Sequence, residues 1–177
     1  MTDDEPTTYE NEPPKSESEM FYESLTQAQD YYGAPDRILQ QLADSADTGG
    51  PGRRIPITLF LHGAVVTGHV TSSQEFYRAM ASAFREHANA AAGGVLPPAA
   101  EDYARDTFER VAKDIDEEID ADSRAYEELG STTARWILTR HLFLADASYT
   151  VPGQPPIPRD FVCVKLEQIA GWTFGAS

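Results

Sequence analysis

A histidine and a glycine at the end of an apolar run are the first residues in this sequence that suggest chemistry. Residues 59–63 read LFLHG, and His62 and Gly63 resemble the strand-to-loop pair that supplies oxyanion-hole amides in α/β-hydrolases. Such an enzyme also needs a G-x-S-x-G turn that exposes a nucleophilic serine, and the sequence contains no such turn. An esterase-like hydrolase is therefore the least favoured alternative, and we interpret His62 as the end of a strand.

The four histidines and the single cysteine show no catalytic or metal-binding pattern. His62, His69, His87 and His141 lack the H-E-x-x-H and H-x-x-E-H spacings, so we expect no metal site and no cofactor. Cys163 lies in an alternating apolar run, which predicts a buried and therefore unreactive thiol. One cysteine cannot form a disulfide within the chain.

Adjacent carboxylates occur at residues 116–117 and 127–128, within a long acidic segment. Acid–base catalysis needs two carboxylates in different environments, whereas neighbours on a polar helix face share one environment. We therefore interpret these pairs as a solvated helix face and predict that the protein is not an enzyme.

Basic residues flank the predicted strands and provide the route by which this chain could bind nucleic acid. A small Sm-like barrel would bring six of them to one rim: Arg53, Arg54, Arg135, Arg140, Arg159 and Lys165. Against this, 29 Asp and Glu residues outnumber 14 Lys and Arg, which gives a formal charge of −15 and repels nucleic acid and anionic lipid. An Sm-like oligomeric nucleic-acid binder remains an alternative, and we expect neither a nucleic-acid nor a membrane partner.

A β-hairpin is the strongest structural signal in the chain. Residues 57–72 read ITLFLHGAVVTGHVTS, in which apolar and β-branched residues alternate on both sides of Gly63. Gly63 is the predicted turn, and Gly68 is a predicted bend in the second arm. Residues 140–149 and 160–175 show the same alternation, with a bend at Gly171, and Trp172 and Phe174 are expected in the core. We expect the two hairpins to meet in one sheet.

Helices are predicted before and between the hairpins. Pro35 opens a helix whose Ile38, Leu39 and Leu42 should pack on the sheet, and Ser72 or Ser73 caps a second helix. A long acidic helix runs from Glu101 to about Leu129 and ends before Gly130. Its apolar stripe contains Ala104, Phe108, Val111, Ile115 and Ile119. Such a stripe packs on the sheet of its own domain or contacts a partner, and the former is more common.

The predicted architecture is an α+β domain with a small, mostly antiparallel sheet of four to five strands, or an open Sm-like barrel of two hairpins. Residues 1–19 are acidic, contain two adjacent prolines and offer little to bury, which predicts a disordered tail. Residues 20–177 form the single domain, with a helical insertion at about 73–130. No apolar run approaches the roughly 20 residues of a membrane span, so we expect a cytoplasmic protein.

Several short motifs together resemble the gas vesicle accessory protein family of the U type. A T-x₄-G-x₄-G-x₂-[ST] hairpin is followed by a His-Leu strand, a proline-containing link and a terminal apolar-x-G-[FW]-x-x-G motif. The resemblance covers about residues 55–90 and 139–175. The matching positions are Thr58, Gly63, Gly68, His141, Leu142, Ala147, Pro158, Ile169, Gly171, Trp172 and Gly175.

This resemblance implies a soluble, non-enzymatic accessory factor that helps to make or organise gas vesicles in the cytoplasm. The implied partners are gas vesicle shell proteins or other accessory proteins. The contact candidates are Phe108, Val111, Ile115 and Ile119 on the long helix. The direct partner, the assembly step and homo-oligomer formation are left open by the sequence.

Overall fold

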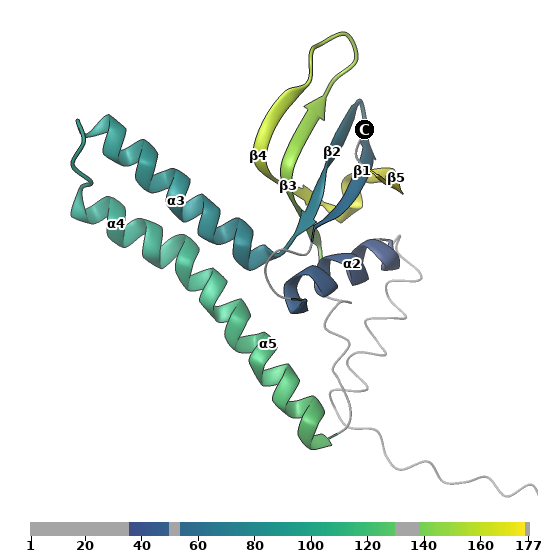
Figure 1. The fold of residues 1–177 in the computed structure, drawn as a ribbon, viewed down its shortest axis with the longest axis horizontal. Coiled ribbons are helices and arrows are strands. Elements are labelled where there is room, and N and C mark those ends of the chain that lie inside the picture. The colour runs from purple at the N-terminus through teal and green to yellow at the C-terminus, as the bar shows by residue number, and fades with distance from the viewer. Residues whose placement is uncertain (1–35, 50–53, 130–138, 176–177) are drawn as a thin grey trace, which may run out of the picture. The chain divides into compact units, whose positions relative to one another are not determined.

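The computed structural model describes residues 36–49, 54–129 and 139–175, which belong to one compact unit, Ala34–Ser177. The predicted disordered tail, residues 1–19, lies outside the described residues. The helices are α2 (Arg37–Thr48), α3 (Ser73–Ala91), α4 (Pro98–Ala104) and α5 (Arg110–Leu129), with a π turn, η1 (Arg105–Glu109), between the last two (Figure 1). The strands are β1 (Ile55–Leu61), β2 (Ala64–Thr71), β3 (His141–Thr150), β4 (Ile157–Lys165) and β5 (Ile169–Phe174), and a 3₁₀ turn, η3 (Leu166–Gln168), precedes β5.

The five strands form one antiparallel sheet in the order β4-β3-β2-β1-β5. This arrangement confirms the predicted α+β class and the antiparallel sheet. The sheet is open, since β4 and β5 are its two edge strands, and the Sm-like comparison stays a prediction. The helices between β2 and β3 form the predicted insertion.

The β1–β2 hairpin matches the sequence prediction closely. Its register pairs Ile55 with Val70 at the open end and Leu61 with Ala64 at the turn. The turn consists of His62 and Gly63, and Gly63 has a φ of 85°, a left-handed conformation that glycine adopts without a steric penalty.

The C-terminal segment corrects the sequence prediction, which treated residues 160–175 as one bent strand. Instead, β4 ends at Lys165 and η3 redirects the chain, so that β5 pairs with β1 at the opposite edge of the sheet. Leu166 is the anchor of this turn: its side chain is 2% exposed, and its N–H donates to the carbonyl oxygen of Arg140 at 2.9 Å. Gly171 lies within β5 opposite Phe60, next to a shift in the β1–β5 register.

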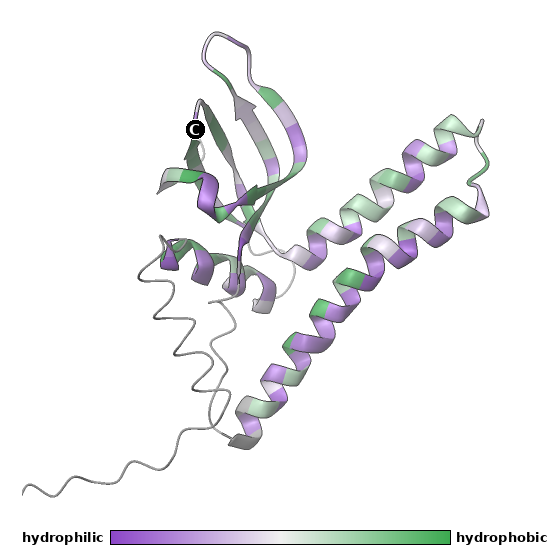
Figure 2. Ribbon diagram, turned by 180° about the vertical axis from the view of Figure 1, so that it is seen from behind, coloured by the Kyte–Doolittle hydropathy of each residue, from purple (hydrophilic) through white to green (hydrophobic). Residues whose placement is uncertain are grey.

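The main hydrophobic core lies between α2 and one face of the sheet. Helix α2 contributes Leu39, Ala43 and Ala46, which confirms the prediction that this helix packs on the sheet. The strand residues buried against it are Ile57, Leu59, Val66, Val70, Leu142, Leu144, Ala147 and Val164. Figure 2 shows the corresponding apolar colouring on the strands. Two expected core residues differ, because Ile38 is 51% and Phe174 is 59% exposed.

Asp36 fixes the start of α2 to the last strand. One carboxylate oxygen accepts hydrogen bonds from the N–H groups of Ile38 and Leu39, at 2.8 and 3.2 Å, and so caps the helix. The other oxygen accepts from Nε1 of Trp172 on β5 at 3.0 Å. Trp172 therefore packs at the margin of the core, as expected, and is also tied to the helix cap.

Helix α3 begins at the predicted cap and joins the helical insertion to the sheet. The Ser72 hydroxyl accepts from the N–H of Glu75 at 3.1 Å. On α2, a carboxylate oxygen of Asp47 accepts from the N–H of Ser73 at 2.7 Å. The ring of Phe76 lies 4.8 Å from that of Phe143 on β3, measured between ring centroids. These contacts set the direction in which α3 leaves the sheet.

Gly68 lies on β2 in close contact with the backbone of β3. The β2–β3 register shifts between Thr67 and His69, and on β3 this bulge contains Asp146, whose φ is 48°. A β-carbon at Gly68 would lie 3.1 Å from the carbonyl oxygen of Ala145 and 3.2 Å from the α-carbon of Ala147. The bulge therefore leaves no room for a side chain at this position.

We expect Gly68→Ala to lower the free energy of unfolding by about 1–3 kcal/mol, because the added methyl group must displace the β3 backbone. Gly171→Ala is the matched control, since its β-carbon would meet only Cδ2 of Phe60 at 3.9 Å, an ordinary van der Waals contact. We expect the control to change stability by less than about 0.5 kcal/mol. Urea unfolding of both variants measures the difference, and equal losses would contradict the close approach.

Candidate functional site

The histidines do not come together in the structure. His62 lies in the β1–β2 turn, His69 on β2, His87 on α3 and His141 on β3. Over residues 36–49, 54–129 and 139–175, no group of three or more His, Cys, Asp or Glu side chains has the geometry to hold a metal ion. The strand-to-loop position of His62 agrees with its interpretation as the end of a strand.

Cys163 is exposed, which corrects the prediction of a buried thiol. Apolar residues occupy both faces of this strand, so the alternation alone could not show which face is buried in the core. In β4, Val164 faces the core, whereas Cys163 lies on the opposite face, where Phe76 of α3 contacts Phe161 of the same strand. Partial desolvation raises the pKa of the Cys163 thiol, and this lowers the fraction of thiolate available as a nucleophile.

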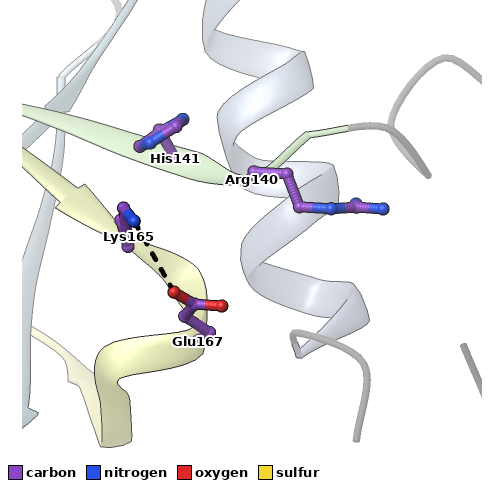
Figure 3. Close-up of a pocket in the computed structure, with 4 residues that line it drawn as sticks. All are labelled: Arg140, His141, Lys165 and Glu167. Atoms are coloured by element: carbon purple, nitrogen blue, oxygen red, sulfur yellow. Dashed lines mark ion pairs between the residues drawn. The ribbon is translucent and has the colours of Figure 1, made fainter. Parts of the chain in front are cut away.

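A small pocket lies where β3 begins and β4 ends. It has a volume of about 190 Å³ and is lined by Arg140, His141, Lys165 and Glu167 (Figure 3). Nζ of Lys165 lies 3.8 Å from Oε1 of Glu167, and the guanidinium of Arg140 points away from both. The pocket is below the range of about 300–1,000 Å³ that small-molecule sites occupy, and its cationic groups do not converge on one point.

The basic rim required by the Sm-like alternative is not seen among the four described members of the set. Arg140 and Lys165 share the small pocket, and Arg159 lies near the opposite end of β4, paired with Ala147. Arg54 is used elsewhere: its guanidinium lies 2.9 Å from Oδ2 of Asp146 and 2.5 Å from Oε1 of Glu75. Arg53 and Arg135 lie outside the described residues.

The Arg54 ion pairs join the sheet to the first turn of α3. The other carboxylate oxygen of Glu75 accepts from the hydroxyl of Thr71 at 2.6 Å. His69 lies at the edge of this group, with Nδ1 3.9 Å from Oδ2 of Asp146. Each acidic group faces a neighbouring donor or cation, so the cluster has the character of a structural link.

The apolar stripe of the long helix packs on α3, and not on the sheet as the sequence analysis expected. The rings of Phe84 and Phe108 are 6.1 Å apart, and Arg78 forms an ion pair with Asp116. In both Figure 1 and Figure 2, α3 and α5 lie side by side as a helical hairpin. The four contact candidates, Phe108, Val111, Ile115 and Ile119, are all partly exposed.

Three alanines of the helical hairpin are fully buried, and Ala104 is the one named in the predicted stripe. Ala81, Ala104 and Ala112 are at most 1% exposed. Ala104 and Ala112 are eight residues apart, which places them about 80° apart around an uninterrupted α-helix. The π turn between them adds one residue and brings the two closer to one face. Ala112 also lies four residues after Phe108 and three before Ile115, so the 3.6-residue repeat places it on the predicted stripe.

Aromatic rings lie near the far end of the helical hairpin. Tyr103 contacts Phe84 and Phe108, with ring centroids 5.0 and 6.2 Å away. Tyr103 is 52% exposed, and Val95 in the connecting loop is 75% exposed. Contacts between partly solvent-exposed aromatic rings therefore stabilise this end of the hairpin.

Arg85 connects the two helices electrostatically. Its Nε and Nη2 each lie 2.7 Å from a carboxylate oxygen of Glu101, and Nη1 lies 2.6 Å from Oε1 of Glu109. These hydrogen bonds raise the pKa of the Arg85 guanidinium above its ordinary value and lower the pKa of both carboxyl groups. The bidentate geometry fixes α3 against α4 and the π turn.

We expect Arg85→Gln to lower the melting temperature by about 3–6 °C, because two carboxylates lose their cationic donor. Arg105→Gln is the matched control, since the ion pairs of Arg105 with Asp102 and Asp106 lie within the same helical segment and its side chain is 54% exposed. We expect the control to change the melting temperature by less than about 2 °C. Melting followed by circular dichroism distinguishes them, and equal shifts would argue against the interhelical role.

The Arg85 contacts also predict a pH dependence. The folded-state pKa values of Glu101 and Glu109 lie below the ordinary glutamate value of 4.5. These contacts therefore contribute stability above that pH, and the contribution is lost as the pH falls through the folded-state values. Between about pH 6 and about pH 3, the wild type should lose more helical stability than Arg85→Gln. Parallel pH profiles for the two proteins would contradict this assignment.

Comparison with known proteins gives one match. The family model described as gas vesicle protein GvpU-like matches residues 36–177. No curated protein and no solved structure matches the chain. The family match includes both hairpins and the whole helical insertion.

Proposed function

Because the chain belongs to the GvpU-like gas vesicle protein family, we propose that it is a non-enzymatic accessory protein for gas vesicle formation or organisation. It acts through protein–protein contacts with gas vesicle shell proteins or other accessory proteins. Its site of action is the cytoplasm, in association with gas vesicles. The proposal includes no catalytic residue, metal or cofactor.

The helical hairpin is the observation that supports a role in protein contacts. The sheet and α2 have a core of their own, whereas the hairpin of α3 and α5 contributes no residue to that core. Its apolar residues Phe108, Val111, Ile115 and Ile119 are only partly buried. Helices recognise partners through apolar side chains at this spacing.

The arrangement of charged groups supports binding over catalysis. The described carboxylates with lowered pKa values, Glu101 and Glu109, both lie against Arg85 and bridge two helices. They share one environment, and so they lack the separated pKa values of an acid–base pair. None of the described helices is both long enough and apolar enough to cross a membrane.

Deletion of the gene from a gas vesicle gene cluster tests the proposal. We expect vesicle number, shape or clustering to change in electron micrographs, because an accessory protein acts on assembly or organisation. Expression of the wild-type protein from a plasmid should restore the original vesicles. Unchanged number, shape and clustering after deletion would contradict the proposed function.

A further inference from the structure

We propose that one face of the first half of α5 is a docking surface for a cationic amphipathic helix of a partner protein. The surface, called here the α5 docking surface, comprises Val111, Ile115 and Ile119 with the carboxylates around them. This inference rests on the proposed function and adds the chemistry of the partner. Three properties of the helix support it: its apolar spacing, its length relative to α3 and its charge.

The apolar residues of the α5 docking surface form a continuous row. Val111, Ile115 and Ile119 recur every four residues and are partly exposed, so each has apolar area that α3 does not cover. In a hairpin of two helices, a residue of the contact seam has a neighbouring helix on one side only. Full burial is restricted to small residues, as seen for Ala81 and Ala112.

The length of α5 exceeds what α3 can cover. Arg78 pairs with Asp116, and α3 begins at Ser73. Because the two helices are antiparallel, the start of α3 lies opposite about residue 121. Helix α5 continues to Leu129, and Figure 1 shows it running past the beginning of α3. Ile119 is therefore close to the end of the α3 contact, and the following turns extend beyond it.

The negative charge of residues 114–129 indicates which kind of partner helix would bind. Between residues 114 and 129 the sequence has eight Asp and Glu residues and a single basic residue, Arg124. Asp114, Glu117, Glu118 and Asp120 are exposed in the structure. Apolar side chains flanked by carboxylates are complementary to a helix that carries an apolar stripe flanked by Lys or Arg.

The same charge disfavours the other occupants of an exposed helix face. A second copy of α5 would bring two acidic segments together, and like charges across an interface destabilise it. Nucleic acid and anionic lipid surfaces would be repelled for the same reason. A cationic amphipathic helix gains from both the apolar row and the surrounding carboxylates.

Peptide binding to the full-length protein tests the inference. The probe is a fluorescent peptide of about 18 residues made of Leu and Lys, with leucines at i, i+3, i+4 and i+7. Its controls are a scrambled peptide of the same composition and a peptide with Glu in place of Lys. We expect the Leu–Lys helix to bind at least about tenfold more tightly than either control, and to weaken as salt is raised.

Paired variants separate the α5 docking surface from general attraction to an acidic protein. Ile115→Ser with Ile119→Ser should weaken binding by roughly tenfold or more, whereas Ile38→Ser, on an exposed isoleucine of α2, should leave it unchanged. Glu118→Gln with Asp120→Asn should weaken binding more than Asp160→Asn with Glu167→Gln, which removes the same charge elsewhere. Circular dichroism confirms that each variant is folded.

Four results would overturn the inference: no binding at low salt, equal binding of the scrambled peptide, equal effects of the paired variants, or self-association. Sedimentation velocity detects the last of these, as a dimer that Ile115→Ser with Ile119→Ser dissociates. Gene deletion with a clear vesicle phenotype, combined with absent peptide binding, would reject the docking surface alone. An absent phenotype with tight peptide binding would reject the vesicle function and keep the docking surface.

Discussion

Burial of one sheet face beneath α2 is the interaction on which the remaining structure depends. Leu39, Ala43 and Ala46 cover strand residues that come from both halves of the chain, including Ile57 and Leu142. The hydrophobic effect there joins two hairpins separated by the helical insertion. Because this core is complete without the insertion, the helices between β2 and β3 can extend from the sheet while their apolar residues pack largely on each other.

The connection between the sheet and the helical hairpin is made at the start of α3. Ser72 caps the helix, Asp47 of α2 accepts from the N–H of Ser73, and Phe76 packs on Phe143. Arg54 adds ion pairs with Glu75 and Asp146. The cap, the ring contact and the ion pairs hold α3 at its start and so define the direction of the long hairpin. The other end of the hairpin is held by contacts between its own helices, such as those of Arg85.

The sequence predicted the elements that depend on local pattern and missed those that depend on distant pairing. Alternation around Gly63 was enough for the first hairpin, and the cap at Ser72 was visible in the residues themselves. The separation of β4 from β5 depends on the burial of Leu166 in the core and on the pairing of β5 with β1. Both are long-range interactions that a local sequence pattern does not encode. The stripe of α5 was predicted, but its packing on α3 instead of the sheet depends on tertiary contacts. The π turn that brings Ala104 and Ala112 closer to one face is not visible in the periodicity. The exposure of Cys163 depends on which sheet face α2 covers.

The hydrogen bond between Asp36 and Trp172 links the first and last described elements through one carboxylate. An indole that donates to a helix cap and lies against the core has a fluorescence emission that depends on both. The chain has two tryptophans, Trp136 and Trp172, and the second is therefore a built-in spectroscopic reporter of whether α2 is seated on the sheet. Closure of the core can thus be followed optically, without a label.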